Sequence, residues 1–157
     1  MDVKKEEAEW EIHKFGGSSL REGALFFKVC QILEKGQLPK KASVVSAIYG
    51  VTDMLSLAVE RAKEGFDIET SIESLRKKHF DIIDDLFRGG PYGEELKRAF
   101  EKDYQSLLHL LKTIEMSSYA SETLMEVIMG YGEIWSAQIL NNLLLSNESS
   151  IFLTILL

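Results

Sequence analysis

Cysteine, proline and histidine are scarce in this sequence of 157 residues, which has one, two and three of them. Because a disulfide needs two thiols, the lone Cys30 excludes an internal disulfide and favours a reducing compartment. Cys30 lies in an apolar helical pattern with no histidine beside it, which favours a buried core thiol over a nucleophile. The histidines, His13, His79 and His109, are too widely separated to indicate a metal site.

Long apolar runs and an excess of positive charge are also missing. Against 25 Asp and Glu stand 18 Lys and Arg, so the formal net charge is −7. That charge argues against a surface built for nucleic acid or for an anionic membrane. Residues 1–9 form a polar leader without the apolar stretch of a signal peptide, and the apolar tail 151–157 is too short to cross a bilayer. We therefore expect a cytoplasmic protein with no nucleic-acid and no membrane partner.

The sequence does contain a glycine-rich turn near its start. Residues 14–20 read Lys-Phe-Gly-Gly-Ser-Ser-Leu and follow residues 10–13, which alternate apolar and polar as a half-buried strand does. A strand that breaks at two glycines before a helix builds an anion cradle, because glycine lets backbone N–H groups approach a ligand and the helix N-terminus adds positive charge. Lys14 would add a full charge, and Ser19 with Glu22 has the spacing of a capping box. An ordinary strand-to-helix turn is the alternative.

Strand and helix patterns alternate along the chain. They predict strands at 10–15 and 42–46, helices at 20–35 and 52–65, and a third strand at 151–157. This order indicates a parallel sheet with right-handed crossovers, in which the first two strands lie side by side. Two or three strands are few for such a fold, and the chain stops on an apolar strand, which indicates a fragment.

Residues 67–113 have a different character. They contain two helical patterns, the first capped by Thr70 and Glu73, and each is apolar on one side and polar on the other, as in an antiparallel helical pair. No catalytic pattern lies inside them, and their charges indicate solvated faces. A further helix is predicted over 121–145, with an interruption at 130–132.

Two later stretches resemble the first in kind. Residues 46–53 read Ser-Ala-Ile-Tyr-Gly-Val-Thr-Asp and run from a strand through a glycine loop to a helix start, where Thr52 either caps the helix or holds a ligand oxygen. Residues 132–136 read Gly-Glu-Ile-Trp-Ser and place Glu133 in the first turn of a helix. The helix dipole favours a carboxylate there without any ligand, so neither stretch alone identifies a site.

Together, the three stretches resemble the successive signatures of the aspartokinases, a family of the amino-acid kinase superfamily. They occur in the family's order, and the resemblance covers nearly the whole chain from Ile12. The P-loop of nucleotide-hydrolysing proteins and the Gly-x-Gly-x-x-Gly fingerprint are absent. The resemblance implies an α/β fold, a three-layer αβα sandwich with a mainly parallel sheet. Residues 10–157 would form an incomplete, N-terminal part of it, with a helical insert at 67–113.

The resemblance also implies an activity. Aspartokinases transfer the γ-phosphoryl group of ATP, used with Mg²⁺, to the side-chain carboxylate of L-aspartate, on the route to lysine, threonine and methionine, and they are homo-oligomers. Lys14 would be catalytic, as the cation on the transferring phosphate, and Glu133 would pair with the α-ammonium of aspartate. The implied ATP- and phosphate-binding residues are Lys14, Phe15, Gly16, Gly17 and Ser18, and the implied aspartate-binding residues are Ser46, Thr52 and Glu133.

The sequence also departs from the family. It contains no Arg-Gly-Gly-Ser-Asp signature, no segment for the nucleotide base and no obvious magnesium-linked carboxylate, so we expect the 157 residues alone to be inactive. One alternative is a superfamily kinase that acts on glutamate or a nucleotide, although the stretch at 46–53 favours aspartate. Another is an inactive remnant, or a helical module that binds a partner through residues 67–113.

Overall fold

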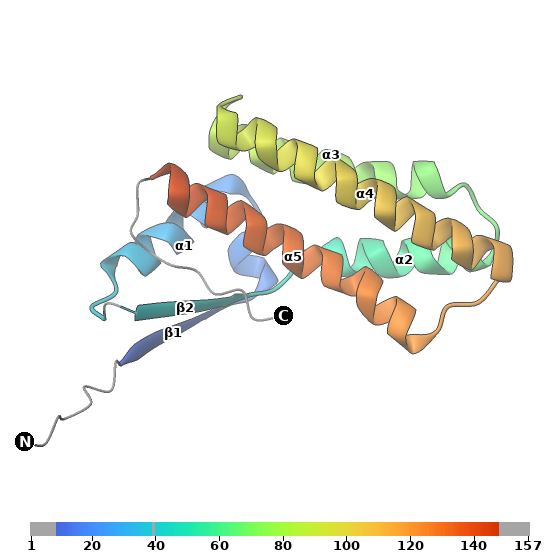
Figure 1. Ribbon diagram of the computed structural model, residues 1–157, viewed down its shortest axis with the longest axis horizontal. Coiled ribbons are helices and arrows are strands. Elements are labelled where there is room, and N and C mark those ends of the chain that lie inside the picture. Colours follow the sequence, from blue (N-terminus) through green and yellow to red (C-terminus); the bar gives the residue numbers. More distant parts are fainter. Residues whose placement is uncertain (1–8, 39, 148–157) are drawn as a thin grey trace, which may run out of the picture.

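The computed structural model describes residues 9–38 and 40–147. The predicted leader, apart from Glu9, and the predicted strand at 151–157 lie outside these ranges. In chain order the elements are β1 (Trp10–Phe15), the short 3-10 helix η1 (Gly17–Leu20), α1 (Gly23–Lys35), β2 (Lys40–Val45), α2 (Val51–Lys63), α3 (Ile68–Phe87), α4 (Pro91–Ser117) and α5 (Glu122–Ser146). The strands lie at one end of the molecule, and α2 to α5 form an elongated helical lobe (Figure 1).

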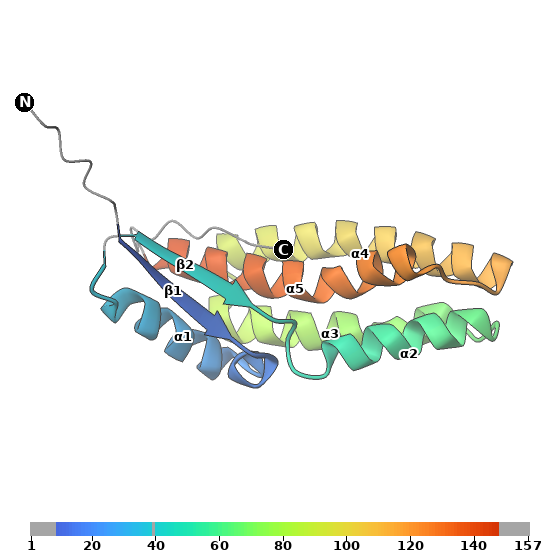
Figure 2. The ribbon, with the colours of Figure 1, turned by 90° about the horizontal axis from the view of Figure 1, so that it is seen from below.

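Strands β1 and β2 form a parallel sheet, with Trp10 opposite Lys40 and Phe15 opposite Val45. The predicted parallel pairing is therefore confirmed. Helices α1 and α5 lie over one face of this sheet, whereas the described residues leave the other face, seen in Figure 2, uncovered. Trp10 and Ile12 are 52% and 71% exposed. The described part of the chain thus has two layers, and the three-layer sandwich is not seen in it.

Helix α5 connects the lobe to the sheet. It begins at the far end of the lobe and ends above the sheet (orange to red in Figure 1), and on this path it contacts α4, α3, α2, α1 and β2. Burying one large apolar side chain stabilises a fold by roughly 1.5–3 kcal/mol, so the core that these elements share holds the thin sheet in place. Fully buried large side chains of that core include Trp135, Phe26, Leu20, Leu33, Ile48 and Leu55.

The predicted core thiol is confirmed. Cys30 lies in α1 and is 1% exposed. Burial, and then the negative charge of Glu34, raises the pKa of Cys30 to about 12. Because the thiolate is the reactive form, Cys30 is chemically inert in the folded protein.

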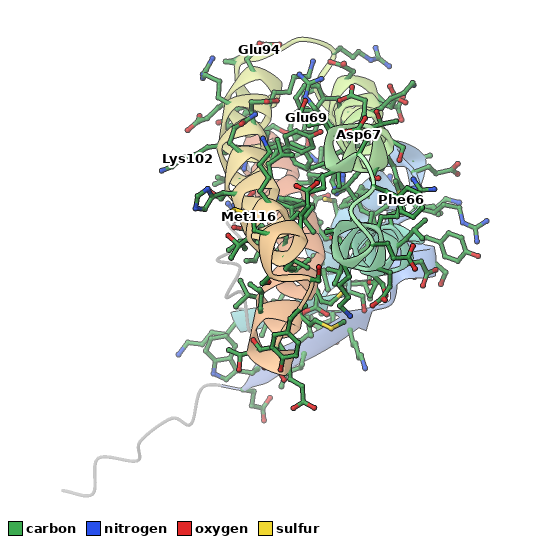
Figure 3. All side chains as sticks on the ribbon, turned by 90° about the vertical axis from the view of Figure 1, so that its right-hand side faces the viewer. Phe66, Asp67, Glu69, Glu94, Lys102 and Met116 are labelled. Carbon is green, nitrogen blue, oxygen red and sulfur yellow. The ribbon has the colours of Figure 1, made fainter. Side chains whose placement is uncertain are left out.

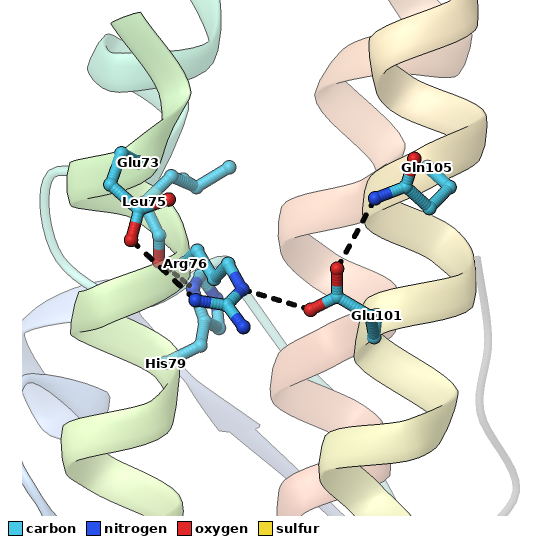
Figure 4. A network of polar contacts seen from close by, with 6 residues as sticks. All are labelled: Glu73, Leu75, Arg76, His79, Glu101 and Gln105. Atoms are coloured by element: carbon cyan, nitrogen blue, oxygen red, sulfur yellow. Dashed lines mark hydrogen bonds and ion pairs between the residues drawn. The ribbon is translucent and has the colours of Figure 1, made fainter. Parts of the chain in front are cut away.

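The expected antiparallel helical pair consists of α3 and α4. Ion pairs join the two helices along their polar side: Arg76 Nε donates to Glu101 at 2.8 Å, and Lys112 lies 3.4 Å from Glu69. Figure 4 shows that Glu101 also accepts a hydrogen bond from Gln105. The hydrogen bond from Arg76 lowers the pKa of Glu101. Partly exposed pairs of this kind contribute little individually.

The outer side of the lobe is polar, as the sequence predicted. Figure 3 looks along the lobe and shows Glu94 and Lys102 projecting outward from α4. An apolar exception is Met116, which is 89% exposed. That residues 67–113 form an insert within a larger domain stays a prediction.

The expected start of the first helix was wrong. Residues 17–20 form η1, and α1 begins only at Gly23, after the N-cap Glu22. No side-chain hydrogen bond caps either helix, so Ser19 and Glu22 form no capping box. The expected cap of α3 was also wrong. Asp67 caps this helix, because its side chain accepts hydrogen bonds from the amides of the second and third residues that follow it.

Helix α5 is continuous, so the interruption expected at 130–132 is wrong, and Glu133 lies in the middle of a helix rather than in its first turn. Glycine in a helix interior costs about 1 kcal/mol relative to alanine. Tertiary packing outweighs that cost here, because the neighbouring Ile128 and Trp135 are 0% and 1% exposed.

A buried histidine stands beside α5 in the lobe core. His79 of α3 is 0% exposed, and its ring centre lies 4.8 Å from that of Phe100 and 4.9 Å from that of Trp135. Its Nδ1 lies 2.8 Å from the carbonyl oxygen of Leu75, as Figure 4 shows, whereas its Nε2 has no hydrogen-bond partner. Burial disfavours the charged form and lowers the pKa of His79 to about 4.

We predict that His79 makes the fold sensitive to acid. The unfolded chain takes up a proton at this residue below about pH 6.5, but the folded chain does so only near pH 4. The neutral, buried His79 therefore contributes fully to stability above pH 6.5, and this contribution is lost as the pH falls toward 4. The loss is about 3 kcal/mol in the free energy of unfolding. Between pH 7 and pH 4, urea unfolding should show that His79→Leu loses less free energy of unfolding than the wild type does. Phe100→Leu, a neighbouring core change without a titrating group, should keep the wild-type loss, and equal losses in all three proteins would contradict the prediction.

Candidate functional site

The glycine-rich turn lies where β1 ends. Phe15 is buried and ends the strand, whereas Lys14 and Ser18 are exposed. The amide of Ser19 donates to the carbonyl oxygen of Gly16 at 2.9 Å, which closes the turn into η1. The long helix α1 starts further on, behind Glu22. The long helix therefore does not begin at this turn, and an anion site with backbone amides and Lys14 as donors stays a prediction.

The second stretch lies at the same edge of the sheet. Because β1 and β2 are parallel, their carboxyl ends meet there, and the amide of Ser46 continues the pairing by donating to the carbonyl oxygen of Phe15 at 3.1 Å. Gly50 has φ of 80°, a conformation that favours glycine, and is the N-cap of α2. Thr52 is the second residue of the helix and is exposed. The side chain of Thr52 is therefore not the cap, and a ligand contact for it stays a prediction.

Gly17 brings the two loops into direct contact. A Cβ atom at Gly17 would lie 2.8 Å from the carbonyl oxygen of Ala47 and 3.5 Å from the backbone of Tyr49. Real Cβ atoms do not approach other atoms as closely as 2.8 Å, so this position requires glycine. Arg21 adds a second link, because its guanidinium lies 4.2 Å from the ring centre of Tyr49. The sequence reading missed Arg21, since no spacing rule joins it to residue 49.

Gly132 brings α5 to the same place. A Cβ atom at Gly132 would lie 2.8 Å from Cβ of Ala47 and 3.0 Å from Cγ1 of Val51. Its chain neighbour Glu133 is exposed. The three stretches therefore meet around Ala47, a residue that the sequence reading did not single out. That Lys14, Ser46, Thr52 and Glu133 face one ligand stays a prediction.

The lobe core holds this part of α5. Trp135 is wedged between His79, Phe100 and Tyr131, and its Nε1 donates to Asp103 of α4 at 3.2 Å. The hydroxyl of Ser136 is buried and donates to the carbonyl oxygen of the preceding helical turn at 3.0 Å. The position of Glu133 is consequently fixed by packing that lies far from it in sequence.

Two further classes of site were sought in the described residues. Within 9–38 and 40–147, no group of three His, Cys, Asp or Glu side chains could hold a metal ion. Over the same ranges, no helix has both the length and the apolar character that a membrane crossing requires.

Known proteins resemble this chain over most of its length. The chain is 30% identical over 148 residues to a bifunctional aspartokinase/homoserine dehydrogenase, chloroplastic, of Daucus carota, covering 89% of this chain and 15% of that protein. It is 29% identical over 136 residues to bifunctional aspartokinase/homoserine dehydrogenase 2 of Escherichia coli K12, covering 85% and 16%. No protein-family model matches.

Solved structures of aspartokinases also resemble this chain. E. coli aspartokinase III in complex with aspartate and ADP matches with a TM-score of 0.76 and 20% identity, over 89% of this chain and 30% of that one. The aspartate kinase of Clostridium acetobutylicum matches with a TM-score of 0.57 and 23% identity, over 83% and 29%. This chain resembles the N-terminal portion of aspartokinases. The predicted resemblance is thus confirmed, and the described residues have the fold of the corresponding part of these kinases.

The resemblance has a limited span. The chain covers about 15% of the length of the bifunctional aspartokinases and about 30% of the aspartokinase structures that it matches. The plant relatives are chloroplastic, so a cytoplasmic location stays a prediction. The relatives described above are aspartokinases, and they support an aspartokinase-type function.

We predict that alanine substitution destabilises the fold at one glycine of the first motif and is tolerated at the other. Gly17→Ala should lower the free energy of unfolding by about 1–3 kcal/mol, because its Cβ would meet the rigid carbonyl of Ala47. Gly16 has φ of −78° and nothing within 4 Å of its Cβ position, so Gly16→Ala should change stability by less than about 1 kcal/mol. Urea unfolding of both variants measures the difference. Similar free energies of unfolding for the two variants would contradict the close contact between Gly17 and Ala47.

Proposed function

We propose that this chain forms the phosphate loop and the aspartate-binding part of an aspartokinase. That enzyme transfers the γ-phosphoryl group of ATP to the side-chain carboxylate of L-aspartate. The observation that carries the proposal is the meeting of the three signatures around Ala47, at the carboxyl edge of a parallel sheet, where such sheets bind ligands. The aspartate and ADP bound in the E. coli aspartokinase III structure support it.

The proposed roles follow from charge and exposure. Lys14 is exposed at the end of β1 and neutralises charge on the transferring phosphate, while the amides of Gly16, Gly17 and Ser18 cradle it. Phosphoryl transfer needs positioning and charge neutralisation rather than a protein nucleophile. The inert Cys30 and the buried His79 are therefore not required for it.

Aspartate would be held by the second and third stretches. Glu133 pairs with the α-ammonium of the substrate, and Ser46 and Thr52 offer hydroxyls to its oxygens. Magnesium accompanies ATP in this chemistry, bound mainly through phosphate oxygens. The described side chains supply no metal cluster, and no step of the proposal depends on one.

We predict that Glu133→Gln weakens binding of L-aspartate by roughly 10–100-fold, the effect of removing the charged partner of an ammonium group. Isothermal titration calorimetry of the 157-residue chain measures this. Glu126→Gln is the matched control, because it makes the same charge change on the exposed surface of α5. Equal affinities for the two variants would remove Glu133 from the site. Tighter binding of glutamate than of aspartate would favour a glutamate kinase.

We predict that the 157 residues by themselves produce no acyl phosphate in a hydroxamate assay. The sequence has neither the Arg-Gly-Gly-Ser-Asp signature nor a segment for the adenine. Losing one preorganised charge contact costs roughly 10³–10⁵ in rate, and several are missing together. E. coli aspartokinase III serves as the positive control. Aspartate-dependent turnover that falls with Lys14→Ala would show that the chain is a complete enzyme.

A further inference from the structure

The contact around Ala47 is close enough to exclude a side chain at two glycines. Ala47 is the second residue after β2 and is 7% exposed. On one side its carbonyl oxygen faces Gly17, and on the other its Cβ faces Gly132, each at 2.8 Å from the position that a Cβ atom would occupy. A side chain at either glycine would have to displace its neighbour. The phosphate loop and α5 are thus separated by one small residue.

Other glycines of the same segments show that this closeness is specific. Gly16, next to Gly17, and Gly130, in the same helix as Gly132, have nothing within 4 Å of their Cβ positions. Neither has a positive φ. Alanine is therefore allowed sterically at 16 and 130 but not at 17 and 132, which face Ala47.

Three of the proposed ligand groups lie one residue from this contact. Ser18 follows Gly17, Thr52 follows Val51, and Glu133 follows Gly132. A displacement of the contact therefore moves the phosphate loop and the aspartate-binding groups relative to each other. Helix α5 has little freedom to absorb such a displacement, because Trp135 is 1% exposed and is hydrogen-bonded to Asp103.

We propose that Ala47 is a positioning residue: it is the spacer that sets the separation between the phosphate loop and Glu133. This inference rests on the proposed function for its consequence in substrate binding, but the spacer itself is a mechanical property of the fold. In-line phosphoryl transfer tolerates little misplacement, since an error of about 1 Å can cost roughly 100-fold in rate. A single methyl group, the side chain of Ala47, would thus decide whether the two halves of the site match.

The test compares Gly132→Ala with Gly130→Ala, the same change two residues away in one helix. Binding of L-aspartate should weaken roughly 10–100-fold in Gly132→Ala and stay within about twofold in Gly130→Ala, since nothing contacts that position. Adding Ala47→Gly to Gly132→Ala removes the closer of the two groups that the new side chain meets and leaves Val51 Cγ1 at 3.0 Å, so it should restore part of the affinity. A loss of stability in Gly132→Ala with unchanged aspartate affinity would overturn the proposal, because the contact would then be structural only.

A readout without ligand separates this proposal from the proposed function. In a ¹H–¹⁵N spectrum, Gly132→Ala should shift the amide resonances of Gly17 and Ser18, and Gly130→Ala should leave them in place. If the wild-type chain binds no aspartate, the proposed function fails for this chain, and the spectrum alone tests whether Ala47 is the spacer. Unmoved resonances of Gly17 and Ser18 would overturn the spacer proposal. If Gly132→Ala does not fold, Ala47→Gly alone, which adds no clash, must shift the same resonances.

Discussion

Close packing between α5 and the loop after β2 is the constraint on which the rest of the structure depends. Within residues 9–38 and 40–147 the sheet has two strands, and two strands do not form a stable sheet without further packing. Helices α1 and α5 supply that packing on one face, and α5 then carries the contact into the helical lobe. Gly132 lets the helix reach Ala47 and Val51. Sheet, loops and lobe are therefore one packed unit.

The lobe in turn holds α5. Trp135 packs against rings from α3 and α4 and is hydrogen-bonded to Asp103, while ion pairs such as Arg76 with Glu101 align the outer two helices. The ion pairs are partly exposed and contribute little energy each, whereas the aromatic contacts are buried. The buried aromatic contacts of the lobe thus hold the segment of α5 that contains Glu133.

Several expectations failed because they relied on local signals. Ser19 and Glu22 have the spacing of a capping box, yet residues 17–20 form a 3-10 helix and neither side chain caps a helix. The two glycines of α5 resemble a helix break, yet tertiary burial keeps the helix continuous. Helix propensity is a weak preference that packing overrides. Strand pairing, by contrast, was predictable, because the order of elements strongly restricts the topology.

By itself, the sequence determined the parallel strand pair, the glycine turn after β1, the helical pair and the resemblance to aspartokinases. These depend on local pattern and on motif order, which are written directly in the chain. Only the tertiary structure decided that the motifs meet at Ala47, that Gly132 rather than Gly130 is the sterically required glycine, and that Glu133 lies mid-helix. Those facts depend on distances between residues far apart in the sequence, such as Ala47 and Gly132, and such distances exist only once the core has packed.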